Sequence, residues 1–237
     1  MTQGISSVEE VKRRLDEHVG RRGYLLPQQG LMAVAMPAMQ DGYTVMYSAL
    51  TVQQNHFSEY EREFVWMAIL SAAGEHIGTH HVHLFKEFGG TPAQAELITD
   101  LVALAMGTPR SYEFMHKHWQ RHFAPMDAVA TYRRAAQRLV GEHNDVPLEL
   151  ARYALLAVHT TFGHAWGVEQ ELLALYDAKG HEGKMAEAIS LPFWAAGVNR
   201  MIDASDVWLG LIRSSRVQAS EPFRVWAETA GQGAMPI

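Results

Sequence analysis

Apolar and polar residues follow one another along this chain with the period of helices rather than of strands. Glycines and prolines divide it into segments of ordinary helical length, and alternating runs of β-branched residues are scarce. We therefore expect an all-α fold. The pattern predicts helices over residues 8–21, 39–53, 58–73, 75–88, 92–106, 111–121, 126–141, 147–162, 164–179, 183–190 and 194–214.

Two segment ends carry clear signals. Ser58 stands before Glu59 and Glu61, which is the pattern of a helix N-cap with acids in the first turn. The tail from Val217 to Ile237 mixes Pro222 and several glycines with scattered apolar residues. We expect it to be a non-helical arm, lying over the surface or over a neighbouring subunit.

The sequence also aligns with itself when it is shifted by a fixed number of residues. A shift of 89 residues places Gly74 on Gly163 and Gly78 on Gly167. The same shift aligns Tyr43 with Tyr132, Leu50 with Leu139 and Trp119 with Trp208, and one further residue aligns Leu101 with Leu191, Gly107 with Gly197 and Arg110 with Arg200. This predicts two diverged copies of one helical unit that share a core. The expected parts are an N-terminal helix and linker over 1–29, a first copy over 30–124, a degenerate second copy over 125–215 and the arm over 216–237.

Most of the recognisable chemistry lies in a histidine-rich segment, residues 74–92. On a helix that turns about 100° per residue, His81 shares the apolar face with Ile77, Leu84 and Phe88. The other three histidines, His76, His80 and His83, form a separate stripe. The two faces predict two different kinds of site.

In one interpretation, His81 transfers a proton to or from a bound substrate. Burial disfavours a charged imidazole, and a general base must be neutral before it acts. Glu75 and His80 complete this candidate catalytic group. The alternative is a core histidine whose ring bonds to a backbone carbonyl.

In the other interpretation, His76, His80 and His83 bind a divalent metal, with a nearby carboxylate or another helix completing the ligand shell. The alternative is a stripe that faces solvent or a second subunit. No cofactor is otherwise expected.

The second copy keeps neither histidine pattern. The 89-residue shift replaces His81 with Gln170 and His76 with Ala165. We therefore expect one site per chain, centred on the first copy. His159, His164 and Glu169 are candidates for a shared site at the junction of the copies, and ordinary hydrogen bonding at a helix surface is their alternative role. His118 and His122, four residues apart, form another candidate histidine cluster. An exposed helix end rich in cations explains them equally well.

Aromatic side chains are the candidates for a substrate pocket. We place Trp66, Phe85 and Trp166 there together with His164. The alternative is that the aromatic rings belong to the core.

Composition excludes several classes of function. The 237 residues contain no cysteine, so disulfides, thiolate metal sites and cysteine nucleophiles are ruled out. A net charge of -6 argues against a nucleic-acid partner or an anionic membrane. The first fifteen residues lack the apolar stretch of a secretion signal, and the apolar run 64–73 is too short to cross a bilayer. We expect a soluble, cytoplasmic protein.

Several short motifs resemble one known family. They are Glu61-Arg62-Glu63-Phe64-Val65-Trp66-Met67-Ala68-Ile69, then Gly74, His81-Val82 and Gly89-Gly90-Thr91-Pro92. Together they resemble the carboxymuconolactone decarboxylase and AhpD-like alkylhydroperoxidase superfamily over residues 40–107, and more weakly over 130–200. The resemblance implies an AhpD-like helical fold and a homo-oligomer, and it places the family's motif histidine on His81.

The resemblance also limits the mechanism. The two cysteines of the peroxidase branch would fall near Gly74 and Ile77, and neither is present. Ile77 also stands where the decarboxylase branch often has an acidic residue. We expect a decarboxylase-like lyase or isomerase of small-molecule catabolism, with aromatic compounds as one candidate substrate class, in which His81 is the acid or base. A metal-dependent enzyme and a non-catalytic ligand-binding or assembly subunit are the alternatives.

Overall fold

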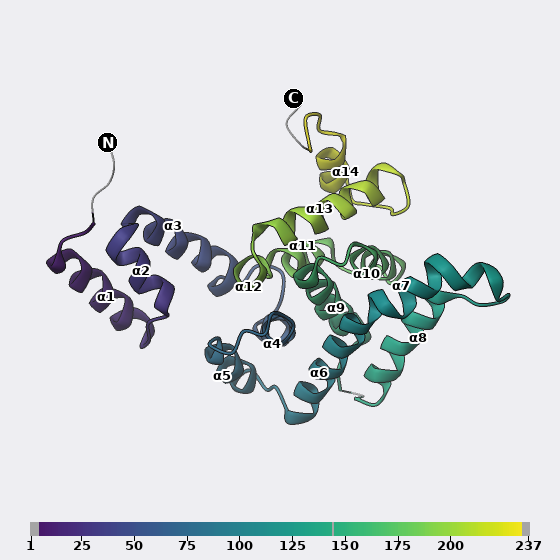
Figure 1. Ribbon diagram of the computed structural model, residues 1–237, viewed down its shortest axis with the longest axis horizontal. Coiled ribbons are helices and arrows are strands. Elements are labelled where there is room, and N and C mark those ends of the chain that lie inside the picture. Colours follow the sequence, from purple (N-terminus) through teal and green to yellow (C-terminus); the bar gives the residue numbers. More distant parts are fainter. Residues whose placement is uncertain (1–4, 144, 234–237) are drawn as a thin grey trace. The chain divides into compact units, whose positions relative to one another are not determined.

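The computed structural model describes residues 5–143 and 145–233, and these ranges fold into helices (Figure 1). No strand occurs in them, which confirms the all-α class. The chain divides into two compact units, Met1–Gln54 and Asn55–Ile237. The boundary expected after residue 29 therefore does not coincide with the observed one, and residues 30–54 belong to the first unit.

Within residues 5–54, the first unit contains three α-helices and a short π-helical turn. They are α1 (Val8–Arg22), α2 (Pro27–Ala35), α3 (Pro37–Tyr47) and η1 (Ser48–Val52). The Arg22 guanidinium lies 4.2 Å from the centre of the Tyr47 ring, and Arg14 pairs with Asp41 at 2.7 Å. Met32 and Tyr47 are buried between these helices.

The second unit contains the remaining elements. These are α4 (Glu59–Ala73), α5 (Thr79–Glu87), α6 (Pro92–Gly107), η2 (Thr108–Arg110), α7 (Tyr112–Phe114), η3 (Met115–Trp119), η4 (Gln120–His122), α8 (Ala128–Gly141), α9 (Leu148–Phe162), α10 (Ala165–Asp177), α11 (Glu182–Ser190), α12 (Phe193–Ala196), α13 (Val198–Arg213) and α14 (Glu221–Glu228). Among the described helices, none combines the length and apolar character needed to span a membrane.

Helix α9 is the centre of the second unit. It packs against α4, α6, α10, α11 and α13 (Figure 1). Every residue from Leu150 to Thr161 is buried, because a helix surrounded by other helices has no solvent-facing side. Helix α9 forms a pair with α10, and α4, which also packs on α9, forms a pair with α5; both pairs carry buried polar groups.

Most predicted helices are confirmed, and the differences are instructive. The predicted helix 111–121 is divided into α7, η3 and η4. Helix α5 begins at Thr79 rather than at residue 75, so Glu75 and His76 lie in the preceding turn. The predicted helix 194–214 is broken at Gly197, whose φ of 88° is not helical. Helix α2 lies in a stretch for which no helix was predicted, with Pro27 in its first turn.

The tail prediction was wrong over α14. Ser220 precedes this helix and Pro222 lies in its first turn, where proline supports a helix instead of breaking it. Phe223 and Trp226 pack against Trp208 of α13, with ring centroids 4.7 and 6.0 Å away. This apolar contact explains why the segment is helical.

Candidate functional site

A buried carboxylate and a buried imidazole meet between α4 and α5. Oε2 of Glu63 lies 2.7 Å from Nδ1 of His81. The residues are 1% and 3% exposed, so the pair is shielded from water. The structure thus places His81 on the inner face of α5, as its apolar pattern predicts.

The surroundings hold this imidazole in one orientation. The indole of Trp66 stacks on the ring of His81 at 4.5 Å between centroids, and His80 lies against it at 4.0 Å. Nε of Arg62 is 3.3 Å from Oε1 of Glu63, which places a cation beside the carboxylate. The chain of contacts runs from Arg62 through Glu63 to His81.

This arrangement assigns the protons on the imidazole. An ionised carboxylate can only accept hydrogen bonds, so with Glu63 ionised Nδ1 of His81 carries the proton that bridges the pair. The second nitrogen, Nε2, then presents a lone pair. A carboxylate in this position also stabilises the imidazolium that forms when the ring takes up a proton. The pair therefore has the features of a general base with its orienting group.

The turn between α4 and α5 fixes the spacing of the pair. Gly74 ends α4 with a φ of 66°, a left-handed conformation that favours glycine. Gly78 leaves room for Leu70, because a Cβ atom there would lie 2.9 Å from the leucine side chain. Glu75, predicted to be catalytic, accepts a hydrogen bond from the backbone of Ile77 at 2.6 Å and is exposed.

A hollow of about 410 Å³ lies beside this turn. Met67, Leu70 and Ser71 of α4 form one wall, on the helix face that also carries Glu63 and Trp66. Residues 74–76, 78, 79 and 82 form the rest. The hollow thus contains Glu75 and His76 and lies next to the buried pair along α4, although neither Glu63 nor His81 lines it.

The predicted metal ligands do not come together. His76 precedes the helix that carries His80 and His83, because α5 starts at Thr79. The side chain of His83 is 80% exposed and lies 3.7 Å from Glu87. In the two described ranges, no three side chains of His, Asp or Glu are placed to hold a metal ion.

The four predicted pocket residues fall into two separate places. Trp66 covers His81, and Phe85 is buried against Tyr60 with the ring centroids 6.1 Å apart. Trp166 and His164 belong to α10 and its N-cap in the other helix pair. The hollow at the α4–α5 turn is lined by none of these four.

The α9–α10 pair holds a second buried polar group. Nη1 of Arg152 lies 3.1 Å from Oε2 of Glu171, and the two residues are 5% and 0% exposed. The hydroxyl of Tyr132 is 2.9 Å from Nε2 of His159, which is fully buried. These two pairs are neighbours, since Glu171 also acts on the Tyr132 hydroxyl.

Burial dominates the protonation of this second group. It lowers the pKa of His159 to about 3, so the ring stays neutral. It also raises the pKa of the Glu171 carboxyl, against the opposing influence of Arg152, and raises that of Tyr132 well above its usual value. The half-buried His164 ring, 5.8 Å from that of His159, has its pKa lowered by burial too.

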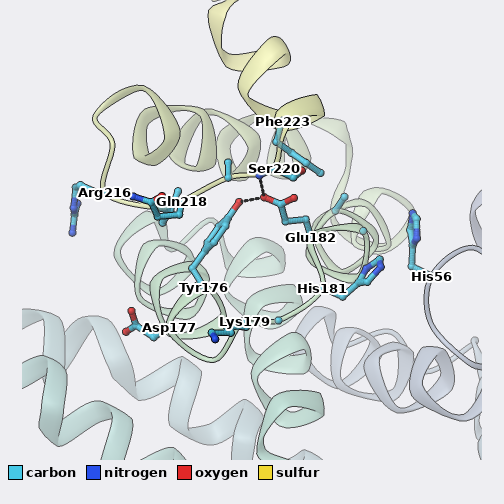
Figure 2. A pocket seen from close by; sticks show the side chains of 15 residues that line it. His56, Tyr176, Asp177, Lys179, His181, Glu182, Arg216, Gln218, Ser220 and Phe223 are labelled. Carbon is cyan, nitrogen blue, oxygen red and sulfur yellow. Dashed lines mark hydrogen bonds between the residues drawn. The ribbon is translucent and has the colours of Figure 1, made fainter.

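A larger cavity lies elsewhere in the second unit, between the α10–α11 turn and the segment joining α13 to α14 (Figure 2). Its volume is about 1010 Å³. Oε1 of Glu182 accepts hydrogen bonds from the Tyr176 hydroxyl at 2.7 Å and from the backbone of Ser220 at 3.0 Å. The rings of His56 and His181 lie 5.5 Å apart at its rim. No residue predicted for a site lines this cavity.

Sequence reasoning missed the acidic partner of His81. Glu63 stands among apolar residues on the face of α4 that continues through Trp66 and Leu70. A carboxylate at such a position needs a buried partner. The 89-residue shift places Glu63 on Arg152, so both of these shift-related positions carry a charge, and this coincidence is the signal that was available.

Comparison of the chain with protein-family models, with curated proteins and with solved structures gives no match. The likeness to the AhpD-like superfamily therefore rests on the motifs quoted above.

Proposed function

We propose that this protein is an acid/base enzyme acting on a small organic acid, with His81 as the group that transfers the proton. The observation that carries the proposal is the buried contact of 2.7 Å between Glu63 and His81. A carboxylate that orients an imidazole is the usual way in which proteins prepare a histidine for proton transfer.

The reaction class proposed is a decarboxylase-like lyase or an isomerase. Both reactions pass through a carbanion or enolate that one well-placed imidazole can protonate. Absence of cysteine removes thiol peroxidation from consideration. The resemblance to the carboxymuconolactone decarboxylase family supports a lactone acid as substrate. An AhpD-like unit present in two copies and a homo-oligomer belong to the same proposal.

The hollow beside the α4–α5 turn is the proposed binding place. It is about 410 Å³ in volume, which suits a small molecule better than a polymer. The wall formed by Met67 and Leu70 is apolar, while Glu75 and His76 are polar. Thr79 and Val82 line it from α5, the helix that carries His81.

The proposal is tested by measuring release of carbon dioxide from a set of small carboxylated lactones, with proton exchange at the carbon next to the carboxylate as a second assay. We expect His81→Gln to lower turnover about 100-fold, because the general base is lost. His83→Gln is the matched control, since its side chain lies on the same helix and is 80% exposed.

Unchanged turnover in a folded His81→Gln protein would remove this residue from the mechanism. Equal losses in both variants would show that the effect is not specific to the buried ring. Far-ultraviolet circular dichroism of each variant separates either outcome from unfolding.

A second candidate function is ligand binding without catalysis. The cavity of about 1010 Å³ in Figure 2 favours it, because that space is much larger than the hollow near His81 and holds no proposed catalytic group. A protein of this kind would bind small acids and leave them unchanged in both assays.

A further inference from the structure

We infer that the α9–α10 pair contains a binding site for a small oxyanion, a carboxylate or a phosphate, at the start of α10 beside Arg200. This site is separate from the Glu63–His81 pair and does not depend on the function proposed for it.

An unpaired cation is the first observation. Arg200, on α13, is half-buried and packs over Gly163, the residue that ends α9. A Cβ atom at position 163 would overlap the guanidinium. Within residues 5–143 and 145–233, that guanidinium makes no hydrogen bond or ion pair. A guanidinium has five N–H donors, and its best partners are carboxylate and phosphate oxygens.

Free backbone amides at the same place are the second observation. Helix α10 follows directly after Gly163, and its N-cap, His164, forms no capping hydrogen bond. The backbone N–H groups of residues 165–167 have no acceptor in the described part of the chain. In the other pair, by contrast, Thr79 and His81 donate their backbone N–H groups to Ile77 and Gly78. Free amides at the positive end of a helix dipole attract anions.

Buried side-chain nitrogens without partners are the third and independent observation. His159 is fully buried, and its Nδ1 finds no hydrogen-bond partner. That ring fills the notch left by Gly167, with Nδ1 as the atom nearest to the missing Cβ, so it faces the first turn of α10. Trp166 is 9% exposed, and its indole N–H, which can only donate, also lacks an acceptor. Nδ1 of His164 is also buried without a hydrogen-bond partner.

These groups together favour an anion over a cation or a water-filled gap. An unmade hydrogen bond of a buried group is costly, so several such groups around the start of α10 point to a ligand that pairs with them. The acidic side chain that acts on His164 from nearby is Glu113, and Lys117 pairs with it at 2.5 Å. Glu113 is thus paired with Lys117, whereas Arg200, which also acts on His164, has no acidic partner in the described part of the chain.

The experiment uses the full chain labelled with ¹⁵N and two probes, benzoate and inorganic phosphate, in separate titrations. We expect saturable shifts of the amide signals of residues 165–167 and of the Trp166 indole signal for at least one probe. Whichever probe binds more tightly identifies the class of oxyanion. Arg200→Gln should weaken that binding at least about tenfold, as loss of a charge-assisted bond does.

Arg110→Gln is the matched control, because the shift of the chain on itself pairs Arg110 with Arg200 and the residue is exposed. It should leave binding unchanged, and so should His81→Gln. Absence of saturable shifts with both probes overturns the inference. Equal affinity of the wild-type and Arg200→Gln proteins, or loss of binding in His81→Gln, overturns it as well, and the last result would place the oxyanion at the proposed catalytic pair.

Discussion

The helix pairs α4–α5 and α9–α10 share one backbone design. The first helix of each ends at a left-handed glycine, Gly74 with a φ of 66° and Gly163 with a φ of 69°. The next residue in each case donates its backbone N–H back to the first helix, Glu75 to Leu70 and His164 to His159, both at 2.9 Å. The same sequence shift relates all these positions, although duplication of the chain stays a prediction.

The difference between the pairs is chemical. Both bury a polar contact between their two helices, but the acid lies on the first helix in one and on the second helix in the other. Glu63 of α4 meets His81 of α5, whereas Arg152 of α9 meets Glu171 of α10. A guanidinium does not release its proton at any ordinary pH, so Arg152 cannot take the part that the proposed mechanism gives to His81.

The largest expected difference between the two helix pairs is in how much a substitution in each buried contact lowers the free energy of unfolding. Arg152→Met leaves Glu171 as a buried charge without its cation, and breaking a buried pair in this way costs about 3–5 kcal/mol. His81→Gln should cost only about 1 kcal/mol, because Glu63 keeps its contact with Arg62 at 3.3 Å. Urea denaturation followed by circular dichroism measures both.

The double variant Arg152→Met with Glu171→Leu controls for packing. It removes both charges and should recover most of the lost free energy of unfolding. A double variant as unstable as Arg152→Met would show that volume, not charge, governs this site.

The next effect concerns activity. Glu63→Gln keeps the size of the side chain but removes the negative charge that orients His81 and stabilises its protonated form. We expect turnover to fall about 100-fold, which corresponds to about 2.7 kcal/mol in the transition state. Glu59→Gln is the control, since Glu59 is exposed in the first turn of the same helix. The carbon dioxide assay measures both, and a fully active Glu63→Gln protein would contradict the role given to the pair.

A third difference is that the α9–α10 pair, through His159, makes the stability of the protein depend on pH. Burial lowers the pKa of His159 to about 3, from 6.5 in an unfolded chain. The unfolded chain therefore binds the extra proton first, and stability decreases as the pH falls from about 6.5 towards 3. Between pH 7 and pH 5 the loss from this residue is about 2 kcal/mol.

His159→Leu copies Leu70, its counterpart in α4, and removes this titration. The free energy of unfolding of the variant should change less between pH 7 and pH 5 than that of the wild-type protein. Parallel pH curves for the two proteins would show that His159 is not buried as a neutral ring.

Helix positions were predictable wherever the apolar period had clear limits. Ser58 and Gly74 bracket α4, and the prediction for that helix agrees within one residue. Pro222 misled the prediction because proline favours the first turn of a helix and opposes its interior. Whether Pro222 starts a helix or interrupts one depends on the contact of α14 with Trp208, a residue of another helix. No local sequence pattern contains that information.

The candidate site was only half predictable for a similar reason. The inward position of His81 follows from the period of its own helix. Its partner, Glu63, lies 18 residues earlier on another helix, so the pairing depends on how α4 and α5 pack. Arg200 is more remote still, since it reaches Gly163 from α13.

The smallest expected effect tests whether the two glycine turns differ as the oxyanion site requires. Alanine is strained at a positive φ, so Gly74→Ala and Gly163→Ala should each lower the free energy of unfolding by about 1 kcal/mol. Their consequences for binding should differ. A Cβ at position 74 meets nothing within 4 Å, whereas one at position 163 displaces the guanidinium of Arg200. Benzoate or phosphate binding at α10 should therefore weaken only in Gly163→Ala. Equal binding by the two variants would mean that Arg200 does not contact the anion from where it lies over Gly163.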